Sequence, residues 1–166
     1  MKKVLVWLDK YLEESLMVLF LLIIVCAMGL QVFMRYVMQN SLSWPDELTR
    51  YAFIWFVFLG IGYAVRNDLH LKVDILETSL IKLKPLLILL QDIIILIFCL
   101  YLFQPSIESI QQLRTSGQTS PALGIDIYLV YSALIIGFIS AIFRLIQKYV
   151  VILIEKIKSY KQKESA

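Results

Sequence analysis

Four long apolar runs, at residues 15–37, 47–66, 86–104 and 127–146, constrain this sequence of 166 residues more than any other feature. Each comes close to the roughly 20 residues that a helix needs to cross a hydrocarbon core about 30 Å thick. Lone strands are excluded there, because lipid would leave their backbone groups unpaired. The runs therefore predict an all-α membrane protein with four transmembrane helices, which form one integral membrane domain over residues 1–166.

The composition argues against a large soluble domain. Hydrophobic residues make up 60% of the chain and charged residues 17%, whereas soluble domains have about 45–50% and about 25%. The polar intervals between the runs are too short to build a core of their own. Residues 1–14 mix lysines with aromatic and aliphatic residues. We expect a short amphipathic helix at the membrane interface there, leading into a first span that is retained as a signal anchor.

Basic residues mark one side of the membrane. They gather in the N-terminal segment, around the second loop and at the C-terminal end: Lys2, Lys3, Lys10, Arg66, Lys72, Lys82, Lys84, Arg144, Lys148, Lys156, Lys158, Lys161 and Lys163. The other side has only Arg35, Arg50 and Arg114. The positive-inside rule therefore predicts that both termini and the second loop are cytoplasmic. The first loop and the third loop, residues 105–126, then face outward. Because the basic residues flank apolar runs and form no stripe, no nucleic acid partner is expected.

The second loop has a helical pattern of its own. Residues 71–84 contain neither Gly nor Pro, and aliphatic residues recur there at helical spacing: Val73, Leu76, Leu80 and Leu83. We expect a helix lying on the cytoplasmic interface between the second and third spans. The fourth run continues past residue 146 with a similar pattern, which predicts that its helix tilts or projects into the cytoplasm.

The hinge between the first two runs holds the densest polar cluster of the chain: Arg35, Trp44, Asp46, Glu47 and Arg50. Charges so close to hydrocarbon need partners or an escape to water, and the tryptophan is typical of an anchor at the headgroup level. Two interpretations stay open. The cluster is either a well-capped and well-anchored helix start, or a surface that docks a partner protein.

Local rules predict how this helix begins. Ser43 is placed to cap it, Asp46 follows three residues later as the acid of a capping box, and Pro45 suits a first helical turn. Arg50 lies four residues after Asp46 and three after Glu47, so we expect these charges to pair on one face of the helix.

Gln31 and Arg35, one turn apart, are the polar residues near the end of the first run. Arg35 can extend its head outward to water or form an ion pair with Asp46 or Glu47 across the hinge. We favour the ion pair, because it would lock the two helices into a hairpin.

Asp92 lies six residues into the third run, about 9 Å along a helix. An acid inside a membrane span suggests function, such as a proton or cation relay. No second acid stands at comparable depth, so we favour a structural role, in which Asp92 pairs with a basic residue near the cytoplasmic side such as Lys148 or Arg144.

Residues that could perform catalysis or hold a cofactor are not grouped in this sequence. His70 is the single histidine, and Cys26 and Cys99 lie inside apolar runs, where free buried thiols are the expectation. Gly60 and Gly62 fall on a membrane helix and favour close helix packing over phosphate binding. Without a nucleophile and base, a metal cluster or a convergent acid pair, we expect neither an enzyme nor a bound cofactor.

Five segments, taken in order, connect the chain to a known family. The first helix ends in QVFMRY (31–36), the hinge reads WPDELTRY (44–51), and the second helix continues as FIWFVFLGIGYAVR (53–66). HLKVD (70–74) follows, and SPALGIDIYLVY (120–131) leads into the last helix, with Asp126 where the family commonly has Pro. This series resembles the small membrane subunit of tripartite ATP-independent periplasmic (TRAP) transporters, the DctQ-like family.

The resemblance implies one subunit of a sodium-coupled transporter in the bacterial inner membrane. A large DctM-like subunit would hold sodium and substrate and move as an elevator, while the small subunit braces it. A periplasmic substrate-binding protein would deliver an organic acid, such as a C4-dicarboxylate or sialic acid, and dock partly on the hinge. A self-assembling four-helix transporter or channel is the alternative, for which Asp92 is the only support in the sequence.

Overall fold

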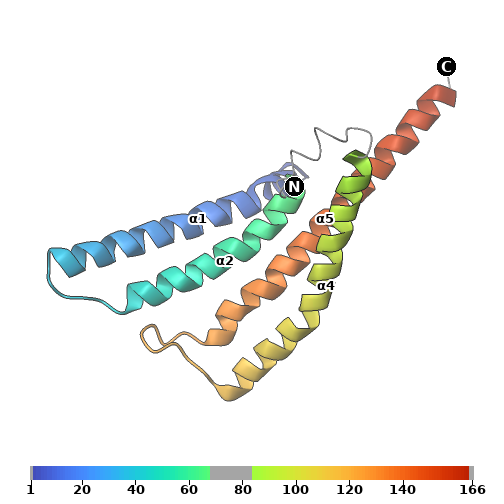
Figure 1. The fold of residues 1–166 in the computed structure, drawn as a ribbon. Coiled ribbons are helices and arrows are strands. Elements are labelled where there is room, and N and C mark those ends of the chain that lie inside the picture. Colours follow the sequence, from blue (N-terminus) through green and yellow to red (C-terminus); the bar gives the residue numbers. More distant parts are fainter. Residues whose placement is uncertain (1, 68–83, 165–166) are drawn as a thin grey trace.

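The computed structural model describes residues 2–67 and 84–164, which form four long helices (Figure 1). These are α1 (Lys2–Tyr36), α2 (Trp44–Arg66), α4 (Lys84–Ser116) and α5 (Ile127–Glu164). Each contains a stretch long and apolar enough to cross a membrane. The prediction of an all-α chain with four transmembrane helices is thus confirmed. The interfacial helix expected over residues 71–84 lies outside the described residues, except for Lys84, where α4 begins.

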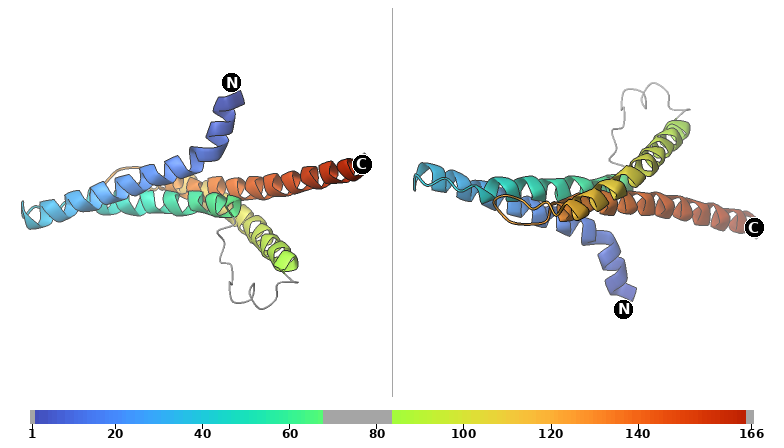
Figure 2. Two further views of the ribbon diagram at one scale, coloured as in Figure 1. Left: turned by 90° about the horizontal axis from the view of Figure 1, so that it is seen from above. Right: turned by 90° about the horizontal axis from the view of Figure 1, so that it is seen from below.

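The helices stand side by side in the order α1, α2, α5, α4. Helix α2 packs against α1 and α5, and α5 packs against α2 and α4, so α1 and α4 lie at the two edges. Figures 1 and 2 show that this arrangement is a curved layer one helix thick. In the most apolar stretch of each helix, 6% of the residues are buried in α1 and 11% in α4, compared with 39% in α5. The edge helices therefore need lipid or another protein to cover them.

The two ends of the layer differ in what they contain. The α1–α2 loop, residues 37–43, and the α4–α5 loop, residues 117–126, lie at one end, which we call the loop end (Figure 1). The start of α1 and the end of α5 lie at the opposite end, which we call the terminal end. Helix α1 is continuous through residues 14 and 15, and its first part bends away from the layer (Figure 2).

Helix α4 is longer than the third apolar run. The sequence places a loop from Pro105 onward, but the helix continues through this proline to Ser116, and the loop begins only at Gly117. Two hydroxyls accompany the proline: Ser106 donates to the carbonyl of Leu102 at 2.6 Å, and Ser109 donates to the carbonyl of Pro105 at 2.8 Å. Neither bond reaches the carbonyl of Tyr101, four residues before Pro105, which is the group that loses its helical donor to the proline. Gly117, with φ of 62°, supplies the left-handed residue that ends the helix.

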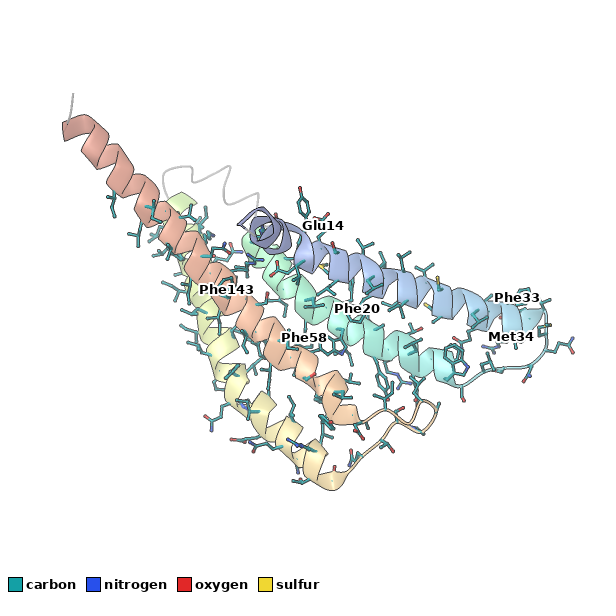
Figure 3. The ribbon with its side chains drawn as sticks, turned by 180° about the vertical axis from the view of Figure 1, so that it is seen from behind. Glu14, Phe20, Phe33, Met34, Phe58 and Phe143 are labelled. Atoms are coloured by element: carbon teal, nitrogen blue, oxygen red, sulfur yellow. The ribbon has the colours of Figure 1, made fainter. Side chains whose placement is uncertain are left out.

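The core lies where α2, α4 and α5 meet. Its buried residues are Val65, Cys99, Phe138, Ala141 and Leu145. Phe58 of α2 lies between α2 and α5 and meets Phe138 edge to face, with ring centres 5.9 Å apart (Figure 3). At Gly137 a β-carbon would lie 2.6 Å from the carbonyl oxygen of Phe58, so only glycine allows this approach of the two helices. Cys26 and Cys99 are both free; Cys99 is buried, as expected, but the expectation of a buried Cys26 is wrong, because its side chain is exposed on α1 at the edge of the layer.

Candidate functional site

Glu47, in the first turn of α2, is the best-connected polar residue at the loop end. It is 8% exposed. Its Oε2 atom accepts three hydrogen bonds: from the Ser120 hydroxyl at 2.8 Å, from the Ala122 amide at 3.1 Å and from the Leu123 amide at 3.2 Å. All three donors belong to the α4–α5 loop, so this one carboxylate fastens the loop to the start of α2.

The α4–α5 loop is folded so that its amides converge on that carboxylate. Thr119 and Asp126 form an antiparallel bridge across its base. The Ser120 amide donates to the Ile125 carbonyl at 2.8 Å, and the Gly124 amide donates back to the Ser120 carbonyl at 3.0 Å. Gly124 has φ of 67°, a conformation that glycine adopts without strain. Consecutive amides arranged in this way form a concave site suited to an anion.

The two sequence segments that contribute this contact were both noticed as motifs, but not as partners. Glu47 belongs to WPDELTRY, and Ser120, Ala122 and Leu123 belong to SPALGIDIYLVY. Apart from the presence of both motifs, nothing in the sequence indicates the contact, because two of the three donors are backbone amides, which no residue type reveals. Glu47, a residue of the hinge, is therefore held by hydrogen bonds from the α4–α5 loop, which lies far along the chain.

The predicted capping box at the start of α2 is wrong. Ser43 does occupy the N-cap position and Pro45 lies in the first turn, as expected, but the Ser43 side chain makes no capping hydrogen bond. Its backbone is helical, with φ of −90° and ψ of −28°, whereas a capping side chain needs an extended backbone. Asp46 and Glu47 remain in the first turn, where acids favour the positive end of the helix dipole.

The ion pairs expected in the hinge are also wrong. Arg35 is exposed at the end of α1, and its guanidinium lies 5.9 Å from the centre of the Tyr36 ring. In the described part of the chain, neither Arg35 nor Arg50 makes an ion-pair contact with Asp46 or Glu47. Arg50 is still near enough for its charge to act on Glu47, but the carboxylate of Glu47 is bonded directly to the α4–α5 loop. Asp46 and Arg50 are exposed, and two further residues singled out in the sequence are half-buried: Gln31 and Trp44.

A second polar cluster, at the terminal end, joins α1, α2 and α5. Glu13 is 5% exposed, and its Oε1 atom accepts from the Ser140 hydroxyl at 2.7 Å and from Nε of Arg144 at 3.0 Å. Arg144 also donates to the side chain of Gln147 at 2.7 Å. Gly62 of α2 leaves space for this cluster, because a β-carbon there would overlap the Ser140 hydroxyl.

Glu13 was not singled out from the sequence. The signal that could have revealed it is helical spacing: Glu13 falls on the same face of α1 as Met17, Phe20 and Ala27. Phe20 stacks on Trp55 of α2 with ring centres 5.9 Å apart, so this face is the one that packs against α2. An acid on a packing face needs a buried cation, and Arg144 provides it.

The third cluster contains Asp92, which is 5% exposed. Its Oδ2 atom accepts from Nζ of Lys148 at 2.9 Å and from the Tyr149 hydroxyl at 2.8 Å. The expectation of a basic partner for Asp92 is confirmed, with Lys148 as the partner. Arg144, the other candidate, is bonded to Glu13 instead.

Helix α5 is therefore linked to both edge helices by ion pairs. Arg144 and Lys148 are one turn apart, and each forms a buried ion pair with an acid of an edge helix: Glu13 of α1 and Asp92 of α4. Breaking such a pair by removing one partner costs about 3–5 kcal/mol, because the other charge stays buried. Among residues 2–67 and 84–164, no group of three or more His, Cys, Asp or Glu could hold a metal ion. The described polar contacts hold helices and a loop in place.

The fold and these contacts define a multi-pass helical membrane protein whose layer of helices is open on both faces. Residues 24–154 match the family model described as tripartite ATP-independent periplasmic transporters, DctQ component. The chain belongs to this family, whose members are small permease subunits of TRAP transporters. The match includes both motifs that meet at Glu47.

Three relatives illustrate the family. A putative TRAP transporter small permease protein of Haemophilus influenzae is 26% identical over 157 residues, which are 92% of this chain and 90% of the relative. The ectoine TRAP transporter small permease protein TeaB of Halomonas elongata is 26% identical over 129 residues, or 77% of this chain and 67% of the relative. The isethionate TRAP transporter permease protein DctMQ of Oleidesulfovibrio alaskensis is 28% identical over 148 residues. This chain spans 23% of that protein's length, with 85% of the chain covered.

Proposed function

We propose that this small permease subunit braces a large DctM-like subunit in the inner membrane and helps a periplasmic binding protein dock during sodium-coupled uptake of an organic acid. The observation that carries the proposal is the open layer. A layer one helix thick encloses no path for a solute, and its edge helices α1 and α4 present mostly exposed apolar side chains (Figure 3). Such helices fit the periphery of a larger helical assembly.

The relatives support a large partner subunit. In Oleidesulfovibrio alaskensis the matching segment is 23% of a protein named DctMQ, a name that joins the two permease components. A segment that is fused to a large permease in one organism is expected to pack against the same kind of permease when it is a separate chain. Sodium and substrate would be held by that large subunit, because the three buried acids of the described residues, Glu13, Glu47 and Asp92, are engaged in internal hydrogen bonds and ion pairs.

The loop end supplies the proposed docking surface for the binding protein. The basic residues at the terminal end favour a cytoplasmic location for both termini, so the loop end would face the periplasm. There the α4–α5 loop exposes Gln118, Pro121, Ala122 and Gly124, while Glu47 holds the loop in one conformation. A loop that is already held in one conformation loses less conformational entropy on binding than a flexible loop does. Arg35, Trp44, Asp46 and Arg50 would surround this surface.

The proposed substrate is an organic acid such as a C4-dicarboxylate or sialic acid. Substrates in the names of relatives include isethionate, ectoine and, for small permease proteins of Pseudomonas aeruginosa and Vibrio cholerae, C4-dicarboxylate. The match to the Pseudomonas protein is 44% identical but spans only 39 residues. It supports the class of transporter more than the particular acid.

Reconstitution tests the proposal. The chain is co-expressed with a DctM-like large permease subunit of the same organism, purified through a tag on one of them, and placed in liposomes with a sodium gradient and a periplasmic binding protein. We expect co-purification, and uptake only when all three proteins and sodium are present. Glu47→Lys should reduce uptake and docking of the binding protein, whereas Glu108→Lys, at an exposed acid of α4, should leave both unchanged.

Two results would contradict the proposal. One is a chain that purifies alone as a stable homo-oligomer and transports solute without another polypeptide, which is the alternative function considered from the sequence. The other is unchanged uptake and complex yield in Glu47→Lys. The alternative loses its support from Asp92, because that acid is bonded to Lys148 and Tyr149 inside the layer.

A further inference from the structure

A groove between α1 and α2, beside the Glu47 cluster, contains polar groups that the contacts described so far do not use. Its volume is about 520 Å³, and it is lined by Ile24, Met28, Asp46, Thr49, Arg50 and Phe53. We call it the α1–α2 groove. Its volume falls within the range of about 300–1,000 Å³ that is common for small-molecule sites.

The polar end of the groove carries an exposed acid, an exposed base whose charge acts on the nearby Glu47, and an unsatisfied hydroxyl. Asp46 and Arg50 are one turn apart on α2 and in the order that favours a helical ion pair. Yet within the described residues they form no ion pair with each other. Between them lies Thr49, whose Oγ1 atom is buried and has no hydrogen-bond partner in the part of the chain that the structure describes. A buried hydroxyl is normally bonded, so this end of the groove is chemically incomplete.

The other end of the groove is apolar. Ile24 and Met28 contribute from α1, and Phe53 contributes from α2, with Met28 51% and Phe53 55% exposed. Phe53 follows Trp44 by nine residues, about 14 Å along a helix. The groove thus runs from charged residues near the start of a membrane helix to apolar residues deeper in the span. This is the polarity profile of a lipid molecule in one leaflet.

We propose that the α1–α2 groove binds a phospholipid whose headgroup carries both a phosphate and an ammonium, of the phosphatidylethanolamine type. Arg50 donates to the phosphate, and Asp46 accepts from the ammonium. The Thr49 hydroxyl donates to the phosphate or the neighbouring ester oxygen, and an acyl chain lies along Ile24, Met28 and Phe53. Two opposite charges held apart match a zwitterion. A lipid with only a phosphate would leave Asp46 facing a second anion.

The occupant is a lipid and not a protein side chain because of where the groove opens. It lies between two helices at the edge of the layer, with half-exposed apolar residues along its length, so the bilayer reaches it in the isolated subunit. The inference does not depend on the transport proposal, because lipid binding is measured on this chain alone.

Lipid binding to the purified full-length chain in detergent tests the inference. Native mass spectrometry would titrate the chain with phosphatidylethanolamine and, separately, with phosphatidylglycerol of the same acyl chains. We expect wild type to prefer the ethanolamine lipid. Arg50→Ala and Asp46→Ala should each weaken its binding about tenfold, as expected for the loss of one charge-assisted hydrogen bond. Thr49→Val should weaken it less. In Asp46→Ala the preference over phosphatidylglycerol should disappear.

The matched control is Arg114→Ala, which removes an exposed arginine of α4 at the same end of the molecule but outside the groove. Its affinity should equal that of wild type. Asp46 and Arg50 are exposed, so both variants are expected to fold. The preference for one lipid over the other is measured on the wild-type chain and depends on no variant. The inference is overturned if wild type shows no preference, or if all variants bind alike. It is also overturned if Arg50→Ala leaves lipid binding intact but lowers the yield of complex with the large subunit, since the groove would then be a protein contact.

Discussion

The Ser120 hydroxyl donates a hydrogen bond to the carboxylate of Glu47 at 2.8 Å, although the two residues are 73 positions apart in the sequence. The bond connects the entry into the second helix with the loop before the last one. Because Glu47 also accepts from two amides of that loop, one side chain sets the conformation of the loop-end surface. The contact is consistent with a role in docking and gives the first prediction.

Glu47→Ala should release the α4–α5 loop while all four helices remain inserted. Hydrogen–deuterium exchange at the Ala122 and Leu123 amides should rise, because both lose their acceptor. We expect a loss of about 2 kcal/mol in the free energy of unfolding, typical of hydrogen bonds to a charged group. Glu108→Ala is the control and should leave exchange in the loop unchanged. Equal protection of the loop in both variants would show that Glu47 does not hold it.

Removing one partner of the Glu13–Arg144 ion pair should lower the free energy of unfolding strongly, whereas replacing both partners with apolar residues should lower it much less. Arg144→Leu or Glu13→Leu should each lower the free energy of unfolding by about 3–5 kcal/mol, because the remaining buried charge loses its counter-ion. The double variant should recover much of that loss. A double-mutant cycle by reversible unfolding in detergent and mild denaturant measures this coupling. If the two single losses simply add, the residues are not coupled as the 3.0 Å contact indicates.

Two variants of Asp92 distinguish a structural role of this acid from a role as a proton relay. Asp92→Asn retains an acceptor for Lys148 and Tyr149, so uptake by the reconstituted transporter should remain within about threefold of wild type. Asp92→Ala leaves the ammonium of Lys148 without its anion and should destabilise the chain by about 3–5 kcal/mol. Uptake assays and thermal unfolding of both variants provide the measurement. A well-folded Asp92→Asn protein without uptake would establish a role for the acid itself.

Three glycines should differ in how well they tolerate replacement by alanine. A β-carbon would overlap the Ser140 hydroxyl at Gly62 and approach the Phe58 carbonyl to 2.6 Å at Gly137, but would meet nothing within 4 Å at Gly29. Alanine at Gly62 or Gly137 should destabilise by about 1–3 kcal/mol through overpacking. Alanine at Gly29 should be neutral or stabilise by up to about 1 kcal/mol through helix propensity. Thermal unfolding compares the three variants, and equal effects would mean that the α2–α5 contact is looser than described.

Membrane orientation is testable with single cysteines in a background of Cys26→Ala and Cys99→Ala. Ser41→Cys and Gln118→Cys at the loop end should react with a membrane-impermeant maleimide added to cells with a permeabilised outer membrane. Ile157→Cys near the end of α5 should react only in inside-out vesicles. These expectations follow from the basic residues at the terminal end. The reverse labelling pattern would place the docking surface in the cytoplasm and exclude contact with a periplasmic protein.

The sequence was informative where a feature depends on local pattern or depth. Four apolar runs were enough to predict four spanning helices, and the depth of Asp92 was enough to predict a basic partner near the cytoplasmic side, for which Lys148 was one of two examples and is correct. Both inferences use only distance along a helix and the high cost of an unpaired charge in lipid.

The sequence was misleading where partners come from distant segments. Local spacing favoured Arg35 and Arg50 as partners of Glu47, but the actual donors include the backbone amides of Ala122 and Leu123, which sequence reading does not see. Proline was taken to end the third helix, but α4 continues through Pro105 to Ser116. Glu13 went unnoticed because its partner lies 131 residues away.

The order of the helices in the layer has a consequence for biosynthesis. Helices emerge from the ribosome in sequence order, so α4 enters the membrane before α5, which is the helix it packs against in the described structure. Until α5 arrives, Asp92 lacks Lys148 and α4 has lipid on most of its circumference. The α1–α2 hairpin can pack as soon as α2 is inserted, but Glu13 and Glu47 also lack their partners until α5 and the loop before it arrive. The last helix to be made therefore supplies the partners of buried acids on both edge helices, so insertion of α5 is the step that completes the layer.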